Sequence, residues 1–323
     1  MKTAWLFPGQ GSQEVGMGKA LAAVSPAAAS IFQRADAALG DPISKLCFEG
    51  PMEELTLTAN TQPAIVTTST AFVAALRERV PELPQPVFAA GHSLGEYSAL
   101  VAAGALDLED AVRLCRVRGS AMQEAVPPGD GAMAAIMGLT EEALRALCDE
   151  AAEGEVVAPA NFNAPGQIVI AGHAGAVARA QALASARGGK AIALKVSAPF
   201  HCALMRPAAR LLEVELERAP IHPLAFPVIA NVDGQANRDE GRVRELLIRQ
   251  IDGPVQWVRS VERMAEEGVT HALEIGPGKV LAGLVKRISK SIQVLSVNDE
   301  ASIGRVREFL GLAPTSPAPT SEA

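Results

Sequence analysis

Short apolar runs alternate along this chain with longer segments in which apolar residues recur at helical spacing. The runs at residues 4–7 and 87–90 predict buried strands, because an uninterrupted apolar run suits a strand that is covered on both faces. Further strands are predicted at 227–231 and 270–275, and helices at 26–39, 63–80, 98–105, 108–124, 243–251, 254–267 and 279–288. This alternation predicts an α/β fold with helices packed on a parallel sheet.

The order of predicted elements changes after residue 131. Strands at 132–137, 156–161, 167–171 and 190–196 are interrupted by helices at 141–152 and 174–186. The order β-α-β-β-α-β over about 65 residues is the ferredoxin-like pattern. We therefore expect a small domain at 127–197, inserted into a larger domain that comprises 1–126 and 198–312. The tail at 313–323 lacks the apolar content to fold and is expected to be disordered.

Composition narrows the classes of protein to which the chain can belong. Of its 323 residues, 49% are hydrophobic but only 4% aromatic, so alanine, leucine and valine form the interior. A net charge of −7 argues against a nucleic-acid partner. No apolar run approaches the roughly 18 residues that a membrane span requires, and the opening run is too short for a signal peptide. Four scattered cysteines indicate neither a zinc site nor a disulfide framework, so we expect a cytoplasmic protein.

The segment GHSLGEY at 91–97 carries the strongest chemical signal. It lies between the predicted strand at 87–90 and the predicted helix at 98–105. A serine on a tight turn between strand and helix, with glycines two residues to either side, is typical of a nucleophile elbow. The turn holds the hydroxyl at a helix N-terminus, where backbone N–H groups can stabilise negative charge. Ser93 is therefore the predicted nucleophile.

A nucleophilic serine needs a base, and the chain has five histidines. His92 adjoins the serine on a sharp turn and is expected to point elsewhere, while His173 and His222 fall in predicted loops. His271 lies in an apolar strand. His201 stands where the chain returns from the predicted insert, and clefts form at such junctions. Elimination therefore favours His201 as the base, although a histidine held only by backbone hydrogen bonds remains an alternative.

The acid of a Ser-His-Asp triad is not apparent in the sequence. In a typical hydrolase it lies between serine and histidine at a strand end. Asp130, Asp149 and Glu153 fall in or beside the predicted insert and lack that context. A Ser-His pair whose imidazole is oriented by a carbonyl or an amide would perform the same proton transfer.

Eight strings, in this order, resemble the malonyl-CoA:acyl carrier protein transacylases. They are FPGQGSQ (7–13), TQPA (61–64), GHSLGEY (91–97), VRG (117–119), NFNAPGQ (161–167), PFH (199–201), PVQW (254–257) and EIGPG (274–278). The resemblance covers nearly all of residues 7–310. It implies an α/β-hydrolase-like large domain that carries a ferredoxin-like insert.

The resemblance also implies roles for individual residues. Ser93 would form an O-malonyl ester, with His201 as general base and then general acid. The backbone carbonyl of Gln250 would orient His201, and Arg118 would pair with the malonyl carboxylate. The residues implied for the oxyanion hole, through their backbone amides, are Gln10 and Leu94, and those implied for the acyl pocket are Phe200 and Met122.

The implied reaction is a ping-pong exchange that serves fatty acid synthesis. Its substrates are malonyl-CoA and the phosphopantetheine thiol of acyl carrier protein, with no bound cofactor or metal, and a monomer is expected. Because carrier proteins are usually acidic, a local basic surface is expected to dock them. The candidates are Lys190 and Lys195, or the cluster Lys279, Lys286, Arg287 and Lys290, although a solvated helix face would look the same in sequence.

Three alternatives remain open at this stage. A polyketide acyltransferase acting in trans, or a malonate decarboxylase subunit, would use the same chemistry with another partner. A serine esterase or thioesterase would share Ser93 and His201. Arg118 argues against it, as does the absence of an acid at the position typical of a Ser-His-Asp triad. A non-catalytic scaffold is disfavoured because both Ser93 and His201 are present.

Overall fold

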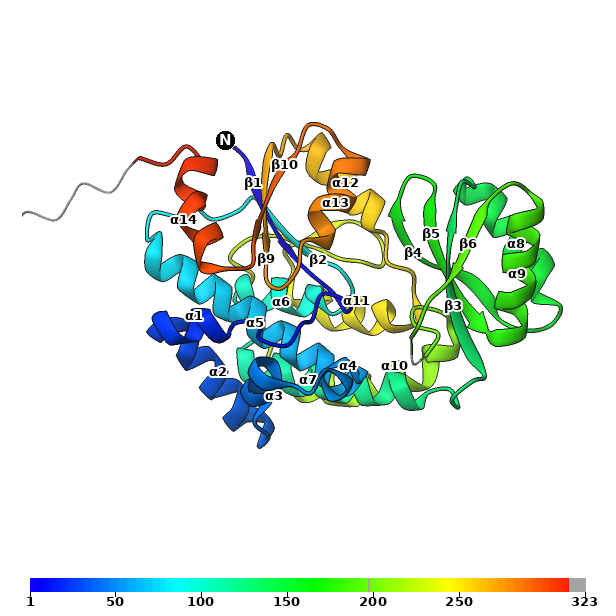
Figure 1. Ribbon diagram of the computed structural model, residues 1–323, viewed down its shortest axis with the longest axis horizontal. Helices are drawn as coiled ribbons and strands as arrows, with labels where there is room; N and C mark the ends of the chain where they lie inside the picture. Colours follow the sequence, from blue (N-terminus) through cyan, green and yellow to red (C-terminus); the bar gives the residue numbers. More distant parts are fainter. Residues whose placement is uncertain (197, 314–323) are drawn as a thin grey trace, which may run out of the picture.

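The computed structural model describes residues 1–196 and 198–313, which form two β-sheets with helices packed around them (Figure 1). The larger sheet has six strands in the order β10-β9-β1-β2-β7-β8. Its strands are β1 (Thr3–Phe7), β2 (Phe88–Gly91), β7 (Val228–Ile229), β8 (Ala236–Asn237), β9 (His271–Ile275) and β10 (Gln293–Val297). All neighbours pair in parallel except β7 and β8, so the predicted parallel sheet carries one antiparallel edge.

The central strand β1 is buried on both faces, as its apolar run predicts. Successive side chains of a strand point to opposite faces. Accordingly Trp5 and Phe7 join one core cluster, with buried residues of α2 (Pro26–Leu39), α5 (Thr58–Arg79), α6 (Gly95–Ala102) and α7 (Leu108–Glu124). Ala4 and Leu6 join the other cluster, with buried residues of α12 (Trp257–Glu266) and α13 (Val280–Ile288). The parallel sheet is thus covered by helices on both sides.

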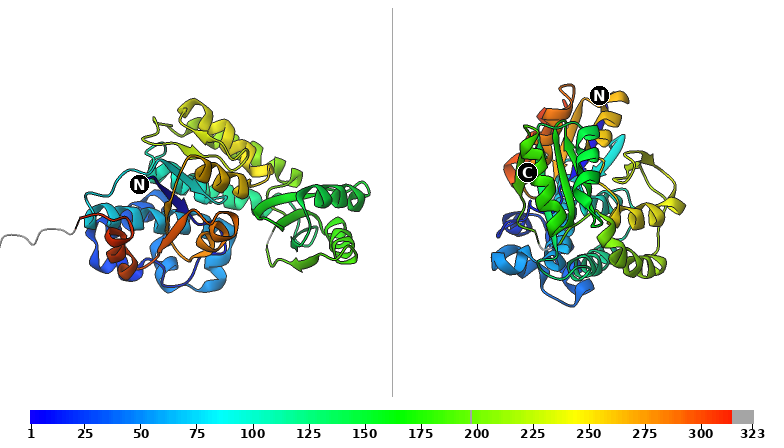
Figure 2. Two further views of the ribbon diagram at one scale, coloured as in Figure 1. Left: turned by 90° about the horizontal axis from the view of Figure 1, so that it is seen from above. Right: turned by 90° about the vertical axis from the view of Figure 1, so that its right-hand side faces the viewer.

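The smaller sheet is antiparallel, with four strands in the order β4-β5-β3-β6. It comprises β3 (Gly131–Met137), β4 (Val157–Ala164), β5 (Gln167–His173) and β6 (Lys190–Ala193), with α8 (Glu141–Ala152) and α9 (Ala174–Ala186) packed on it. This sheet and its two helices form one end of an elongated molecule (Figures 1 and 2). The chain enters it after α7 and returns through η1 (Ala203–Met205) and α10 (Arg206–Arg218).

Several element boundaries differ from the sequence predictions. The helix predicted at 98–105 begins at Gly95, because the turn that carries Ser93 runs directly into α6. The helix predicted at 63–80 begins at Thr58, so that Pro63 lies within it. The strand predicted at 190–196 ends at Ala193. The predicted disordered tail lies outside the described residues, apart from Ala313.

Other elements were not predicted from the sequence at all. They are α1 (Lys19–Val24), α3 (Ile43–Glu49), α4 (Met52–Thr56), α14 (Glu300–Phe309), α10, η1, β8 and β10; α11 (Glu240–Asp252) was expected only from residue 243. Most are short, so their packing partners rather than their own pattern define them. The exception is α10, whose 13 residues bury Ala208, Ala209, Leu212 and Leu216 at helical spacing. Within the described residues, no helix has the length and apolar character to cross a bilayer.

Candidate active site

The turn between β2 and α6 places Ser93 at the carboxyl edge of the parallel sheet. Ser93 has φ 52°, a left-handed conformation that is unusual for a residue with a side chain. A Cβ on Gly91 would lie 1.9 Å from the backbone of Gly95, and a Cβ on Gly95 would lie 2.3 Å from the Phe7 carbonyl oxygen. The turn can therefore close only with glycine on both sides, as expected for a nucleophile elbow.

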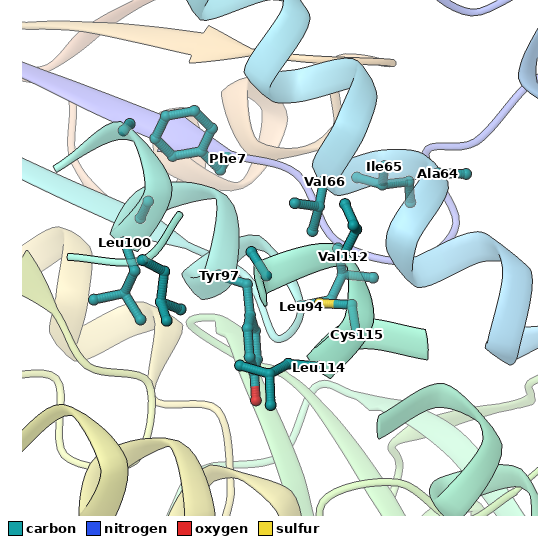
Figure 3. Packing of buried hydrophobic residues seen from close by; sticks show 14 of the residues in the cluster. Phe7, Ala64, Ile65, Val66, Leu94, Tyr97, Leu100, Val112, Leu114 and Cys115 are labelled. Atoms are coloured by element: carbon teal, nitrogen blue, oxygen red, sulfur yellow. The ribbon is translucent and has the colours of Figure 1, made fainter. Parts of the chain in front are cut away.

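Buried apolar side chains anchor the start of α6 beneath this turn. Leu94 and Tyr97 are fully buried in the large core cluster. Figure 3 shows them packed with Val66 of α5 and with Val112 and Cys115 of α7. Because these contacts lock the first turn of α6, they hold the strained Ser93 in position.

Asn231 closes the turn from the neighbouring strand end. Its Oδ1 accepts a hydrogen bond from the Ser93 N–H at 2.6 Å, and its Nδ2 donates to the Gly91 carbonyl at 2.6 Å. The side chain is fully buried. Sequence reasoning did not single out Asn231, although its place directly after the apolar segment at 227–231 offered a signal: carboxyl ends of adjacent parallel strands share one edge of a sheet.

Ser93 and His201 lie in hydrogen-bonding contact, with 2.8 Å between Ser93 Oγ and His201 Nε2. On the other side of the ring, Nδ1 lies 2.9 Å from the Gln250 carbonyl oxygen and 3.2 Å from that of Gly253. Carbonyls only accept, so Nδ1 carries the proton and Nε2 is free to accept the hydroxyl proton. Burial, and secondly the charge of Arg118, lower the pKa of His201 to about 3, so the ring is a neutral base.

Arg118 projects from α7 to the same point and is only 1% exposed. Its Nη1 donates to Gln62 Oε1 at 2.7 Å, and its Nη2 donates to Gln250 Oε1 at 2.9 Å and to Ser93 Oγ at 3.1 Å. None of these acceptors is charged, and among the described residues no carboxylate lies within ion-pair distance of the guanidinium. The guanidinium also lies 5.8 Å from the centroid of the Tyr97 ring. A buried cation without an anionic partner is costly, so the guanidinium is suited to pair with an anion.

A close approach of two helices brings Arg118 beside Gln62. A Cβ on Gly119 would lie 2.5 Å from the Thr58 carbonyl oxygen, so α7 can approach α5 this closely only because residue 119 is glycine. Gln62, which is also buried, was not recognised as a site residue from the sequence. The string TQPA at 61–64 was the signal that could have identified it.

These groups line a cavity of about 280 Å³ between the two sheets. The two residues predicted for the acyl pocket, Phe200 and Met122, both line it, as does Lys195. The lining also includes Gln10, Gly11, Gln13, Gln62, His92, Ser93, Arg118, Asn161, Asn163 and His201. Six of the predicted residues therefore gather at one concave site, as substrate sites usually do, whereas Leu94 and Gln250 are not among the residues that line it.

The backbone amides of Gln10 and Leu94 are available at this site. Neither N–H donates to an acceptor in the part of the chain that the structure describes. Leu94 is the residue before α6, so its N–H also lies at the positive end of the helix dipole. The Gln10 side chain donates to Thr58 Oγ1 at 3.3 Å and leaves the amide free. Two free N–H groups near a serine can stabilise an oxyanion.

The remaining histidines have other partners. His92 lines the cavity and bonds through Nε2 to Asn163 Oδ1 at 2.8 Å, whereas the Ser93 hydroxyl bonds to His201. His173 is the last residue of β5 rather than a loop residue, and its Nδ1 accepts a hydrogen bond from the Val156 N–H. His222 lies 3.6 Å from Asp107, and His271 packs against the Phe309 ring.

A buried carboxylate, Glu96, lies beneath the site and was not predicted from the sequence. Its Oε2 accepts from the Asn231 N–H at 2.9 Å and from Gln250 Nε2 at 2.7 Å. Burial raises the pKa of Glu96 to about 7. Among residues 1–196 and 198–313, no cluster of three or more His, Cys, Asp or Glu side chains is placed to hold a metal.

Known proteins with the same architecture are similar over almost the whole chain. Residues 4–313 match the family described as acyl transferase domain. The malonyl CoA-acyl carrier protein transacylase of Haemophilus influenzae is 51% identical over 310 residues, which cover 96% of this chain and 99% of that protein. That of Escherichia coli K12 is 50% identical over 307 residues, which cover 95% and 99%.

Solved structures agree in fold. A malonyl-transacylase in complex with a type II PKS acyl-carrier protein has a TM-score of 0.92 at 46% identity and covers 95% of this chain and 99% of its own. An acyl carrier protein S-malonyltransferase from Vibrio cholerae has a TM-score of 0.91 at 47% identity and covers 95% and 100%. The chain therefore belongs to the family of acyl transferase domains.

Proposed function

We propose that this protein transfers a malonyl group from malonyl-CoA to the phosphopantetheine thiol of an acyl carrier protein, through an ester on Ser93. The observation that carries the proposal is the buried, unpaired guanidinium of Arg118, whose Nη2 lies 3.1 Å from Ser93 Oγ. A nucleophile beside an anion-binding site suits an acyl group that ends in a carboxylate. Relatives at 50% and 51% identity that are named malonyl CoA-acyl carrier protein transacylases support it.

In the first half-reaction, Ser93 Oγ bonds to the thioester carbonyl carbon while its proton passes to His201 Nε2. The carbonyl electrons move onto oxygen, where the Gln10 and Leu94 N–H groups donate to it. The C–S bond then breaks, its electron pair leaves on the CoA sulfur, and the imidazolium returns the proton to that sulfur. Each oxyanion donor of this kind contributes about 3–4 kcal/mol to the transition state.

In the second half-reaction the carrier thiol replaces CoA. His201 takes the thiol proton, the sulfur bonds to the ester carbonyl carbon, and the C–O bond breaks with return of the proton to Ser93 Oγ. The carbonyls of Gln250 and Gly253 hold His201 throughout, and they do so without the charge of a triad acid. The low pKa of His201 keeps the imidazole neutral, so Nε2 has a free lone pair at the start of each half-reaction.

Arg118 provides the preference for malonyl over acetyl groups. Its planar guanidinium can pair with a carboxylate in two parallel hydrogen bonds, whereas an acetyl group would leave it buried and unpaired. Phe200 and Met122 line the same cavity and are proposed to close it against an α-methyl branch, which favours malonyl over methylmalonyl. The pair formed by Arg118 and the malonyl carboxylate, here called the carboxylate clamp, is also proposed to hold the ester on Ser93. In that position the thiol at the end of the phosphopantetheine arm would reach the ester more readily than water.

We further propose fatty acid synthesis as the pathway and the cytoplasm as the location, which fits the four free cysteines. A polyketide carrier is the second candidate partner, because a neighbour at 46% identity was solved with a type II PKS acyl-carrier protein. The proposed domains are an α/β-hydrolase-like body at 1–126 and 198–312 and a ferredoxin-like insert at 127–197. The strand order β4-β5-β3-β6 supports the second assignment.

The test is intact-protein mass after brief exposure to malonyl-CoA without carrier protein. We expect one malonyl adduct on the wild type and none on Ser93→Ala. The adduct should disappear when phosphopantetheinylated carrier protein is added, with malonyl carrier as the product. Free malonate and CoA without an adduct would instead identify an esterase and overturn the proposal.

A further inference from the structure

Glu96 is a buried acid that the proposed mechanism does not use. It lies in the first turn of α6, is 3% exposed, and has no cation within ion-pair distance among the described residues. Its two hydrogen bonds both come from amide N–H groups, those of the Asn231 backbone and of the Gln250 side chain. Burying a carboxylate without a cation costs free energy of folding, so the presence of Glu96 in the core needs an explanation beyond packing.

The bond from Gln250 decides how that side chain is oriented. Glu96 Oε2 accepts from Gln250 Nε2, so Gln250 turns its NH2 group toward Glu96. The same Nε2 also donates to the Ser93 carbonyl at 3.0 Å. Consequently Gln250 Oε1 faces the opposite way and accepts from Arg118 Nη2 at 2.9 Å. With the amide reversed, an NH2 group would oppose the guanidinium, and two donors would face each other.

We propose that Glu96 is a positioning residue that acts through Gln250 to hold the Arg118 guanidinium where it pairs with the acyl carboxylate. The inference rests on the proposed function and adds a residue to it. Glu96 contacts no reacting atom, and its effect passes through one amide. The same Gln250 presents its backbone carbonyl to His201, so a single residue links the acid, the guanidinium and the base.

An amide between Glu96 and Arg118 has a different effect from a direct ion pair. A carboxylate bonded directly to the guanidinium would occupy the N–H groups that the substrate needs and would neutralise the anion site. The Gln250 amide separates Glu96 from the guanidinium of Arg118. The carboxylate still offsets part of the buried positive charge, because Coulomb energy falls only as the inverse of distance. The guanidinium is thus oriented and partly compensated while it stays free to bind an anion.

The test compares malonyl-CoA with acetyl-CoA in variants of Glu96, because the two substrates differ in the carboxylate that Arg118 recognises. In Glu96→Leu the Gln250 NH2 group loses one of its two acceptors and is held only by the Ser93 carbonyl, so the amide can reverse more easily. We expect kcat/KM for malonyl-CoA to fall by about ten- to hundredfold, while that for acetyl-CoA changes far less. Glu96→Gln keeps an acceptor oxygen for both N–H groups and should retain most of the selectivity.

Glu274→Leu is the matched control. Glu274 is also a fully buried acid that accepts backbone N–H bonds, from Leu281 and Ala282, but it has no bond to Gln250. Damage to the fold alone should lower the rates for both substrates together, as we expect in this control. If Glu96→Leu does the same, Glu96 is merely structural and the proposal is wrong.

Two further measurements keep the test decisive. In a Gln250→Leu background the link from Glu96 through Gln250 to Arg118 is already absent, so adding Glu96→Leu should cause no further loss of selectivity. A loss as large as in the wild-type background would contradict a role through Gln250. If Glu96→Leu does not fold, Glu96→Asp withdraws the carboxylate by one methylene and should still lower selectivity, and unchanged selectivity would overturn the proposal. Failure of the proposed function itself is recognised separately, because the wild type would then show no preference for malonyl-CoA.

Discussion

The guanidinium of Arg118 donates to the hydroxyl of Ser93, with 3.1 Å between Nη2 and Oγ. The same oxygen lies 2.8 Å from His201 Nε2, so one buried positive charge touches the nucleophile and lies close to the base. An acyl carboxylate that pairs with Arg118 would neutralise this charge at the moment the thioester reaches Ser93. Selectivity and proton transfer are therefore expected to depend on the same side chain.

Replacing Arg118 should weaken the preference for malonyl over acetyl groups. Arg118→Ala removes the pairing group, so kcat/KM for malonyl-CoA should fall by about a hundredfold, the effect of losing one or two hydrogen bonds to a charged group. Use of acetyl-CoA should rise relative to malonyl-CoA. Arg118→Lys keeps the charge but not the planar fork and should recover only part of the loss. Steady-state kinetics with both substrates measures the ratio, and unchanged selectivity in Arg118→Ala would remove the carboxylate clamp.

The pH dependence of kcat/KM should show the effect of the Arg118 charge on His201. Burial is the first cause and Arg118 the second of the low pKa of His201, about 3, so the acid limb of kcat/KM for acetyl-CoA should lie well below pH 6.5. In Arg118→Ala the imidazolium is less disfavoured, the pKa of His201 rises, and the limb should move to higher pH. The comparison is made in the Glu96→Gln background, which removes from the titration the buried carboxyl group that lies beneath the site. A limb that stays in place would contradict the influence of Arg118.

Local pattern made the turn around Ser93 predictable from the sequence, whereas the contacts that hold it were not. An apolar run, two glycines and a following helix are features of adjacent residues. Asn231 and Gln250 reach Ser93 across 138 and 157 residues of chain, and no periodicity encodes such pairings. Glu96 belonged to a recognised string, but its role depends on which amides the fold brings to it.

The same distinction applies to the fold. The alternation of strands and helices predicted the parallel sheet and the antiparallel one, because both follow from hydrophobic period and element order. The edge strands β8 and β10 were missed: β8 has two residues, and β10 has an exposed first residue and three half-buried ones after it. Neither offers the fully apolar run by which β1 was recognised.

Asn231 should contribute to both stability and rate. Asn231→Leu leaves the Ser93 N–H and the Gly91 carbonyl without partners in a buried turn, at a cost of about 2 kcal/mol in the free energy of unfolding. The rate of adduct formation should fall as well, because Ser93 is then free to relax from φ 52°. Asn231→Asp keeps the acceptor for Ser93 and should lose less. Urea unfolding measures the change in the free energy of unfolding, and the malonyl adduct mass over time measures the rate. A stable, fully active Asn231→Leu would show that the turn keeps its conformation without the Asn231 side chain.

The two glycines of the turn should tolerate no side chain. In Gly91→Ala the new Cβ would lie 1.9 Å from the Gly95 backbone, so we expect a loss of about 3 kcal/mol or more, and little folded protein. Gly40→Ala is the control: Gly40 ends α2 with φ 64° and has open space around it, so only about 1 kcal/mol should be lost. Equal losses in both variants, measured by thermal unfolding, would mean that the turn can shift to admit the new Cβ and that close approach does not require glycine at position 91.

The basic residues near the junction of the two sheets should govern carrier docking. Lys286 and Arg287 are exposed at the end of α13, and Arg287 donates to Gln167 Oε1 at the start of β5, so this cluster bridges to the small sheet. In a chain of net charge −7, a local basic cluster can attract an acidic carrier that the whole surface would repel.

Charge reversal separates docking from acyl binding. Lys286→Glu with Arg287→Glu should raise KM for carrier protein several-fold, leave KM for malonyl-CoA unchanged, and lose this effect as salt shortens the Debye length below about 10 Å. Lys195 differs, because it lines the cavity itself, so Lys195→Glu should raise both KM values. Lys19→Glu on α1, which changes the net charge by half as much, is the control for charge reversal away from this cluster. If the double variant raised KM for carrier and for malonyl-CoA equally, or no more than Lys19→Glu does, the α13 cluster would be a solvated helix face and the carrier would dock elsewhere.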